Sequence, residues 1–412
     1  MARPSKALSP SLERLEDRRL LAFDPSPQAQ EMLEHVNRMR MNPQAEQQVL
    51  FTSLAPLQAR DADANAAVQY FKDPSAAEIR SEWPTLQPAA PLAWNESLSA
   101  AATTHSRLMI QHDTQSHQLP GEPDLATRTR NAGYAGYSGV GENAFAFAKN
   151  VFHAHSAFAI DWAVPDRGHR TMMMDPSFKE FGVGLESDTS PATSVGPLVV
   201  TQNFGSRFAD GGPFVVGVIY RDANANRRYD AGEGLGGATV RVVGPSATFT
   251  TTTMSAGGYQ LQVPQGTYTI TAMGGGLPGL YRSTNVQVVS ANVKVDFDAT
   301  STPFAVRPTA PTEVVVTVVN RRATVQWTPP ASNGGLPISR YVIQLSTDGG
   351  ATWKAARVAR GTVTSAPVLG LEYGASYLFR VAAGTLAGNS VFSRPSTPVI
   401  PTAPLIATTP AS

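Results

Sequence analysis

The chain has 412 residues, 42% of them hydrophobic, which is typical of roughly two to four globular domains with buried cores. Its 33 basic and 32 acidic residues give a formal net charge of +1, so the overall balance does not indicate a nucleic acid or an anionic surface as partner. The absence of cysteine excludes disulfides, thiolate metal sites and cysteine nucleophiles, and no apolar run approaches the ~18 residues of a membrane span.

The first segment, residues 1–25, contains a short charged stretch from Ser11 to Ala22, with Glu and Arg at mutually supporting helical spacings. Taken alone, this stretch predicts a solvated amphipathic helix. It also closely resembles the leader at the start of many large exported planctomycete proteins, where it is thought to mark an envelope or surface destination. That resemblance implies export, and the segment is then an address rather than a part of the fold.

Helices are predicted in the region that follows. Ser26-Pro27 is typical of a helix start, because Ser caps the first turn and Pro fits the first helical position, and Asn42-Pro43 repeats the pattern for a shorter helix. Residues 52–90 lack sustained periodicity and are predicted to be an insertion or loop with a helical turn or two. A clear helix is expected from Asn95 to about residue 112.

A second core helix is expected from about residue 148 to 162, with His155 in its packing and His153 on the surface. Strands at roughly 180–187 and 197–205 then complete a first domain. Helices followed by strands indicate an α+β fold.

Three motifs punctuate this domain in order. They are Gly141-Glu142-Asn143, Gly168-His169-Arg170 and Thr201-Gln202-Asn203-Phe204-Gly205. Together they resemble the CAP superfamily, named for cysteine-rich secretory proteins, antigen five and pathogenesis-related proteins, and in particular its cysteine-free bacterial branch. The resemblance covers roughly residues 27–207. For a domain at 26–208 it implies an α-β-α sandwich with a cleft at one edge of a small sheet.

In the resembled family two histidines and two acids converge in the cleft, and His117, Glu142 and His169 occupy three of these positions. The fourth acid, expected three residues after the Trp of the preceding helix, falls at Pro165, so Asp166 is the nearby candidate. Two imidazoles and a carboxylate are a ligand set for a divalent ion, and with imidazole ligands and no thiols zinc is the expected ion. The alternative is that Glu142 and His169 only hydrogen-bond the loops together.

A composition change near residue 210 marks the start of an all-β unit predicted at 213–300, whose strand order resembles the B-type repeats of Gram-positive surface adhesins and transthyretin-like folds. Between its first two strands, oxygen-bearing side chains occupy positions one, three, five, nine and twelve of a loop, the spacing with which one loop encircles calcium. They are Asp222, Asn224, Asn226, Asp230 and Glu233. Arg227 replaces the usual glycine, and the alternative is a polar turn without an ion.

A third unit, predicted at 306–401, resembles a fibronectin type III domain, with Trp327 as core aromatic and Leu371 and Tyr377 in the places of the corner motif. Residues 402–412, rich in Pro, Thr and Ala, are predicted to be a disordered tail. The expected fold class is therefore multidomain, with an α+β domain followed by two all-β sandwiches.

Three functions are compatible with these features. We expect an extracellular, secreted or cell-surface protein that binds a lipid, sterol, glycan or peptide in the cleft without catalysis, while the β units contact a surface or matrix partner; no nucleic acid is expected. The first alternative is a metal-dependent hydrolase or peptidase that uses His117, His169 and Glu142. The second is a structural adhesin with an inert cleft. No Gly-x-Ser-x-Gly or His-Glu-x-x-His motif favours the enzymatic alternative.

Overall fold

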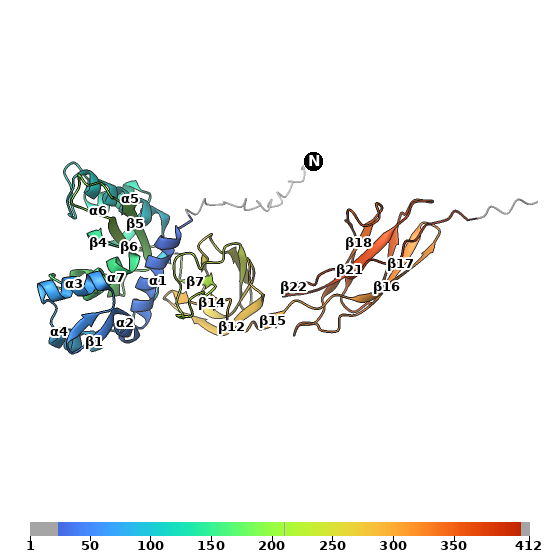
Figure 1. Ribbon diagram of the computed structural model, residues 1–412, viewed down its shortest axis with the longest axis horizontal. Coiled ribbons are helices and arrows are strands. Elements are labelled where there is room, and N and C mark those ends of the chain that lie inside the picture. Colours follow the sequence, from blue (N-terminus) through green and yellow to red (C-terminus); the bar gives the residue numbers. More distant parts are fainter. Residues whose placement is uncertain (1–23, 210, 405–412) are drawn as a thin grey trace, which may run out of the picture.

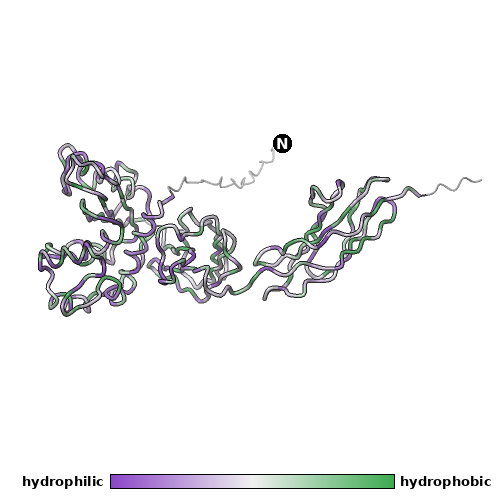
Figure 2. The backbone as a smooth tube through the Cα atoms, in the orientation of Figure 1, coloured by the Kyte–Doolittle hydropathy of each residue, from purple (hydrophilic) through white to green (hydrophobic). Residues whose placement is uncertain are grey.

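The computed structural model describes residues 24–209 and 211–404, which form three successive bodies along the chain (Figure 1). Hydrophobic residues are distributed through all three of them (Figure 2), and each body has its own core. The predicted leader, residues 1–25, and the predicted tail, residues 402–412, lie almost entirely outside the described residues. Within the described ranges, no helix is both long and apolar enough to cross a membrane.

The first body combines helices with a small sheet. Its elements are α1 (Pro27–Met41), α2 (Pro43–Leu50), β1 (Phe51–Leu54), β2 (Leu57–Ala59), α3 (Ala62–Phe71), α4 (Ala76–Glu82), η1 (Trp83–Thr85), β3 (Ala93–Trp94), α5 (Glu96–Gln111), α6 (Leu125–Asn131), β4 (Tyr137–Ala148), α7 (Val151–Ile160), α8 (Gly168–Met174), β5 (Glu180–Ser187) and β6 (Leu198–Arg207). The sheet has the order β3-β5-β6-β4, with β3 parallel to β5 and the other pairs antiparallel.

Alternation along β5 places helices on both faces of this sheet. Phe181 and Val183 join the core that contains α1 and α7. Gly182 and Gly184 face α5 so closely that an added Cβ would meet the helix backbone at 2.1 and 2.4 Å. The glycines therefore allow α5 to pack directly on the strand. The result is the expected α-β-α layering.

Sequence signals at the helix starts are confirmed, whereas the prediction for residues 52–90 is wrong. The side chain of Ser26 caps α1, that of Asn42 caps α2 and that of Asn95 caps α5. Residues 52–90 contain a strand pair and two helices rather than a loop, and α4 begins with a capping box at Ser75. Each of these elements is short, so none shows a hydrophobic periodicity long enough to recognise in the sequence.

The second body is a β-sandwich. Its strands are β7 (Phe214–Tyr220), β8 (Ala238–Val243), β9 (Thr248–Thr252), β10 (Gly258–Gln262), β11 (Gly266–Gly274), β12 (Gly279–Val288), β13 (Val293–Lys294), β14 (Phe297–Asp298) and β15 (Ala305–Val306). One sheet has the order β10-β7-β13, with β14 also paired to β7, and the other has the order β15-β12-β11-β8-β9.

This second body packs directly on the first. Asn292 donates from Nδ2 to the carbonyl oxygens of Pro91 and Lys179 at 3.0 and 2.8 Å. Lys294, only 6% exposed, places Nζ 2.7 Å from a carboxylate oxygen of Glu34 in α1. Buried polar contacts of this kind hold two bodies in one relative position, because separating them leaves the polar groups without partners.

The third body is a second β-sandwich. Its strands are β16 (Thr312–Val319), β17 (Arg322–Thr328), β18 (Arg340–Ser346), β19 (Lys354–Arg360), β20 (Ser365–Leu369), β21 (Leu378–Thr385) and β22 (Gly388–Asn389), in sheets β16-β17-β20 and β19-β18-β21-β22. Trp327 lies buried with its ring centroid 4.9 Å from that of Tyr341. The hydroxyl of Tyr377 accepts a bond from the backbone N–H of Glu372 at 2.9 Å, as expected for the corner motif. The predicted fold class, α+β followed by β-sandwiches, is therefore confirmed.

Candidate functional site

A pocket of the first body lies beside the junction of α7 and α8. The chain leaves α7 through Asp161, whose φ is 63°, and enters α8 from Arg167, whose φ is 54°. The left-handed residue directly before α8 is Arg167, and Gly168 begins the helix. His169 therefore sits on the first turn of a short helix and not in a loop.

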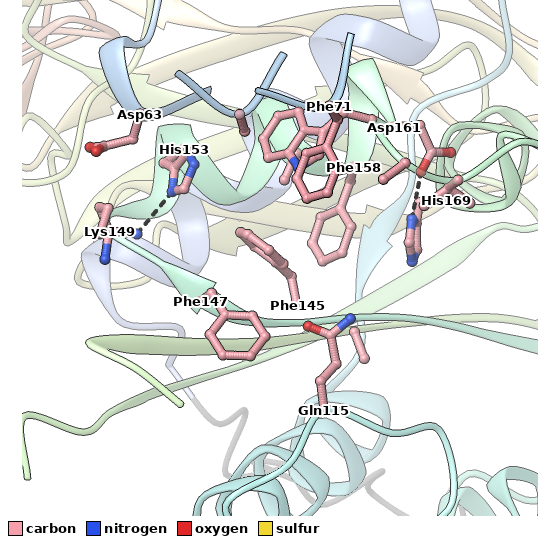
Figure 3. A pocket seen from close by; sticks show the side chains of 16 residues that line it. Asp63, Phe71, Gln115, Phe145, Phe147, Lys149, His153, Phe158, Asp161 and His169 are labelled. Atoms are coloured by element: carbon pink, nitrogen blue, oxygen red, sulfur yellow. Dashed lines mark hydrogen bonds and ion pairs between the residues drawn. The ribbon is translucent and has the colours of Figure 1, made fainter. Parts of the chain in front are cut away.

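Asp161 fixes the ring of His169. Its carboxylate is fully buried, with Oδ1 2.6 Å from Nδ1 of His169 and Oδ2 accepting the backbone N–H of Arg170 at 3.1 Å. A carboxylate on Nδ1 holds the proton there and leaves Nε2 as the acceptor of a neutral ring. Figure 3 shows the second ring nitrogen of His169 turned away from Asp161. Asn143 of β4 supports the same residue by donating to the carbonyl oxygen of His169 at 3.1 Å.

Aromatic side chains form the walls of this pocket, which has a volume of about 480 Å³. Phe145 is central, with the rings of His153, Phe158 and Trp162 edge-on around it at 5.6, 6.3 and 6.3 Å. The polar lining is provided by His169, Asp161, His153, Asp63, Gln115 and Lys149. His153 was expected on the surface, but it is 5% exposed and stacks on Trp162. It is buried because α3 covers the face of α7 that carries it, a contact that comes from the misjudged segment 52–90.

His117 and Glu142 contact each other, but neither lines the aromatic pocket that contains His169. Nδ1 of His117 lies 2.9 Å from Oε1 of Glu142, and the side chain of His117 is 60% exposed. The second oxygen of Glu142 binds Arg128, and His105 lies 3.6 Å from the first. Burial raises the pKa of Glu142, but the bond from His117 together with the charges of His105 and Arg128 outweighs it, so that pKa is lowered.

His105 of α5 is fully buried in the core of the first body. Its Nδ1 lies 2.8 Å from Glu122 and its Nε2 bonds the carbonyl oxygen of Ser116 at 2.8 Å. Both nitrogens are therefore engaged, and this histidine anchors the loop that carries His117.

The structure thus separates the predicted cleft residues into two pairs, His117 with Glu142 and His169 with Asp161. The lining of the aromatic pocket includes His169 but neither His117 nor Glu142. Asp166, the candidate for the fourth acid, is exposed and accepts the N–H of Gly168 at 3.3 Å. The acid that contacts His169 is instead Asp161. The signal for it in the sequence was an acidic residue directly before Trp162, at the end of a predicted helix.

A metal site is not evident in the arrangement of these side chains. Within residues 24–209 and 211–404, no group of three or more His, Asp or Glu residues is placed to hold a metal ion. Both oxygens of Glu142 already contact His117 and Arg128. The residues as they lie do not fit a shared zinc ion, and a zinc site at His117 and His169 stays a prediction.

The predicted calcium loop of the second body is closed by its own hydrogen bonds. Asp222 accepts the N–H groups of Asn226 and Arg227 at 3.1 and 2.8 Å, and Arg227 adopts the positive φ that glycine would favour. Asp230 accepts the side-chain amides of Asn224 and Asn226 at 2.8 and 2.6 Å. Glu233 reaches back to the N–H groups of Ala223 and Asp230. The five predicted ligands therefore share one loop, and calcium binding by them stays a prediction.

Comparisons with known proteins match two parts of the chain. Residues 33–204 match the family model described as "CAP: Cysteine-rich secretory protein family", and residues 309–399 match that of the fibronectin type III domain. Among solved structures, "Titin kinase and its flanking domains" is 35% identical over 23% of this chain, with a TM-score of 0.22. This chain spans 17% of that titin chain. An Fn3-like protein from Clostridium thermocellum is 19% identical over 22% of this chain and 88% of its own, with a TM-score of 0.19.

Proposed function

We propose that this chain, an extracellular multidomain protein with a CAP domain at residues 33–204 and a fibronectin type III domain at residues 309–399, binds a lipid-like ligand in its aromatic pocket. The observation that carries the proposal is the pocket of about 480 Å³, walled by phenylalanine and tryptophan, with His169 in its lining. Its volume is within the range of small-molecule sites, about 300–1,000 Å³.

The lining favours a ligand with an apolar body and a single polar group. Phe145, Phe158 and Trp162 offer ring faces and edges to an acyl chain or a sterol ring system. His169 offers Nε2 to a hydroxyl or protonated carboxyl group, and Asp161 keeps the ring from rotating. Apolar side chains make up most of the lining, which suits a lipid better than a glycan.

Catalysis is the less favoured function. The described residues that line the pocket include no Ser, Thr or Cys, so a hydroxyl or thiol nucleophile is absent from that surface. His117 and Glu142, which the hydrolase alternative requires beside His169, lie outside the lining. An Asp161–His169 pair can act on water without a nucleophilic side chain, and turnover of an ester substrate tests for this activity.

The experiment uses the full chain and two fluorescent probes, a fatty acid and a sterol. Phe147 and Phe304 form a matched pair for substitution, because they are 43% and 44% exposed and only Phe147 lines the pocket. Both probes are tested at equal concentration. We expect at least one of them to bind, and we expect Phe147→Ser to weaken that binding several-fold while Phe304→Ser leaves it unchanged.

Two results would contradict the proposal. One is no saturable binding of either probe; the other is an equal effect of the two substitutions. Turnover of a long-chain ester that is lost in His169→Asn would instead favour the hydrolase.

A further inference from the structure

The fibronectin type III domain is strongly basic, although the whole chain is nearly neutral. Residues 309–399 contain eight Lys and Arg residues and three Asp and Glu residues, a net charge of +5, against +1 for all 412 residues. A domain that carries such an excess has a positive potential around it. The remainder of the chain is net negative, so the whole-chain balance conceals this contrast.

Within the described residues, no carboxylate forms an ion pair with these cations. Every ion pair recorded in the described part of the chain joins residues between Glu31 and Asp296, which leaves the domain's basic side chains without one. Asp348, in the turn between β18 and β19, uses its carboxylate to bond Ser346 and Thr352. The positive charge therefore faces solvent uncompensated.

Several of the cations share one face of the β19-β18-β21-β22 sheet. Arg340 of β18 lies directly opposite Arg360 of β19 in the strand register, and both are at least partly exposed. Tyr341 and Ile343, which alternate with Arg340 along β18, point into the core. The arginines therefore point outward. Like charges directly opposite each other on neighbouring strands destabilise a sheet, so stability alone does not account for this pair.

A third guanidinium is held extended on the same face. Arg380 of β21 lies opposite Gln344, whose Oε1 accepts two of its N–H groups at 2.8 and 2.6 Å. The rings of Trp353 and Phe392 flank it, with centroids 4.2 and 4.4 Å from its guanidinium carbon. Stacking and bonding reduce the freedom that an arginine loses on binding a ligand. Lys354 and Arg357 add exposed charges along the edge strand β19.

We propose that this outward face, defined by Arg340, Arg360 and Arg380, binds a linear polysaccharide that carries sulfate or carboxylate groups. Guanidinium groups bind both anions through paired N–H donors. A row of fixed cations on a flat sheet suits an extended polymer with regularly repeated charges. The extracellular setting of CAP and fibronectin type III domains favours a polysaccharide over a nucleic acid. This inference does not depend on the ligand of the CAP pocket.

The test measures binding of the full chain to immobilised heparin and to soluble polygalacturonate, with neutral dextran as the negative control. Arg360→Ser and Arg322→Ser are matched variants: both residues are exposed, both lie on strands of the same domain and both substitutions remove one charge. Arg322 faces Leu369 on the other sheet. We expect binding at about 0.15 M salt that falls as salt is raised. Arg360→Ser should weaken it three- to tenfold and Arg322→Ser by less than twofold.

The melting temperature separates a lost contact from a damaged fold. Because Arg360→Ser removes a like-charged pair, we expect the domain's Tm to stay the same or rise while binding falls. Equal losses in the two variants, or no binding to either polysaccharide, would overturn the proposal and leave the edge cations with the role of preventing strand-to-strand aggregation. Equally tight binding of duplex DNA with the same variant pattern would overturn the choice of a polysaccharide.

Discussion

The carboxylate of Asp161 and the imidazole of His169 lie 2.6 Å apart and join the end of α7 to the first turn of α8. Asp161 is fully buried whereas His169 is one-fifth exposed. The pair thus connects the core of the CAP domain to the surface of its pocket. This relationship leads to the first prediction.

Asp161→Asn should weaken binding of the fluorescent probe about tenfold or more, because a bond to a charged group contributes about 1.5–3 kcal/mol, roughly 10- to 150-fold, and the amide no longer fixes the ring. The matched control is Asp166→Asn, since Asp166 only accepts the N–H of Gly168 and does not line the pocket. Fluorescence titration measures both variants. A larger effect of the Asp166 substitution would restore the assignment made from the sequence.

The predicted zinc site requires that His117 and His169 bind the same ion. Zinc affinity should then be lower at pH 5.5 than at pH 7.5, because protons compete for the imidazoles. His117→Ala and His169→Ala should each weaken binding. Calorimetric titration of the full chain is the measurement, and two variants that bind as well as the unsubstituted protein would remove zinc from consideration.

Calcium should stabilise the second body if Asp222, Asp230 and Glu233 bind it, since an ion that binds only the folded loop raises its Tm. With few charged ligands, the effect should require millimolar calcium. Thermal unfolding is compared with calcium and with chelator. Asp222→Ala should abolish the difference, and an unchanged Tm in all conditions would show that the loop is a hydrogen-bonded turn only.

Glu31 of α1 gives a pH dependence with a defined sign. Burial, and then the negative charges of Asp230 and Glu233, raises its pKa to about 7 against the opposing charge of Arg38. Between about pH 4.5 and 7 the folded chain holds a proton that the unfolded chain releases, so the free energy of unfolding falls as pH rises through this window.

Glu31→Gln removes that ionisation. We therefore expect the variant to be more stable than the unsubstituted chain at pH 8 and to show a flatter profile from pH 5 to 7, measured by urea unfolding. Glu372→Gln, an exposed carboxylate in the third body, is the control. A Glu31→Gln profile parallel to that of the unsubstituted chain would mean that Glu31 is ionised throughout.

Lys294→Met tests the contact between the first two bodies. Lys294 lies between the carboxylates of Glu34 and Asp296, and its removal leaves Glu34 buried without a cation. Breaking a buried pair in this way costs about 3–5 kcal/mol. Chemical unfolding should therefore show a lowered transition for the first two bodies and an unchanged one for the third.

The double variant Glu34→Gln/Lys294→Met should recover part of that loss, because no unpaired charge remains. A loss confined to the second body would indicate that the two bodies unfold independently.

The sequence by itself determined the elements whose signals are local. Ser26 and Asn95 cap helices because their side chains reach the free N–H groups of the next turn, whatever packs outside. Trp327 and Tyr377 lie buried in the third body, as the resemblance to a fibronectin type III domain implied. The pairing of His117 with Glu142 was also predicted, through resemblance to a family.

Only the tertiary structure decided which groups meet across elements. Asp161 rather than Asp166 supports His169, because a left-handed residue at the end of α7 turns the carboxylate inward, and spacing along the chain does not report that direction. The cover over His153 and the meeting of Lys294 with Glu34 depend on how α3 and the second body dock. Likewise, Arg340 became the neighbour of Arg360 through strand register. Such contacts join residues on different elements, and the way those elements pack decides which residues meet. Composition and periodicity therefore do not indicate them.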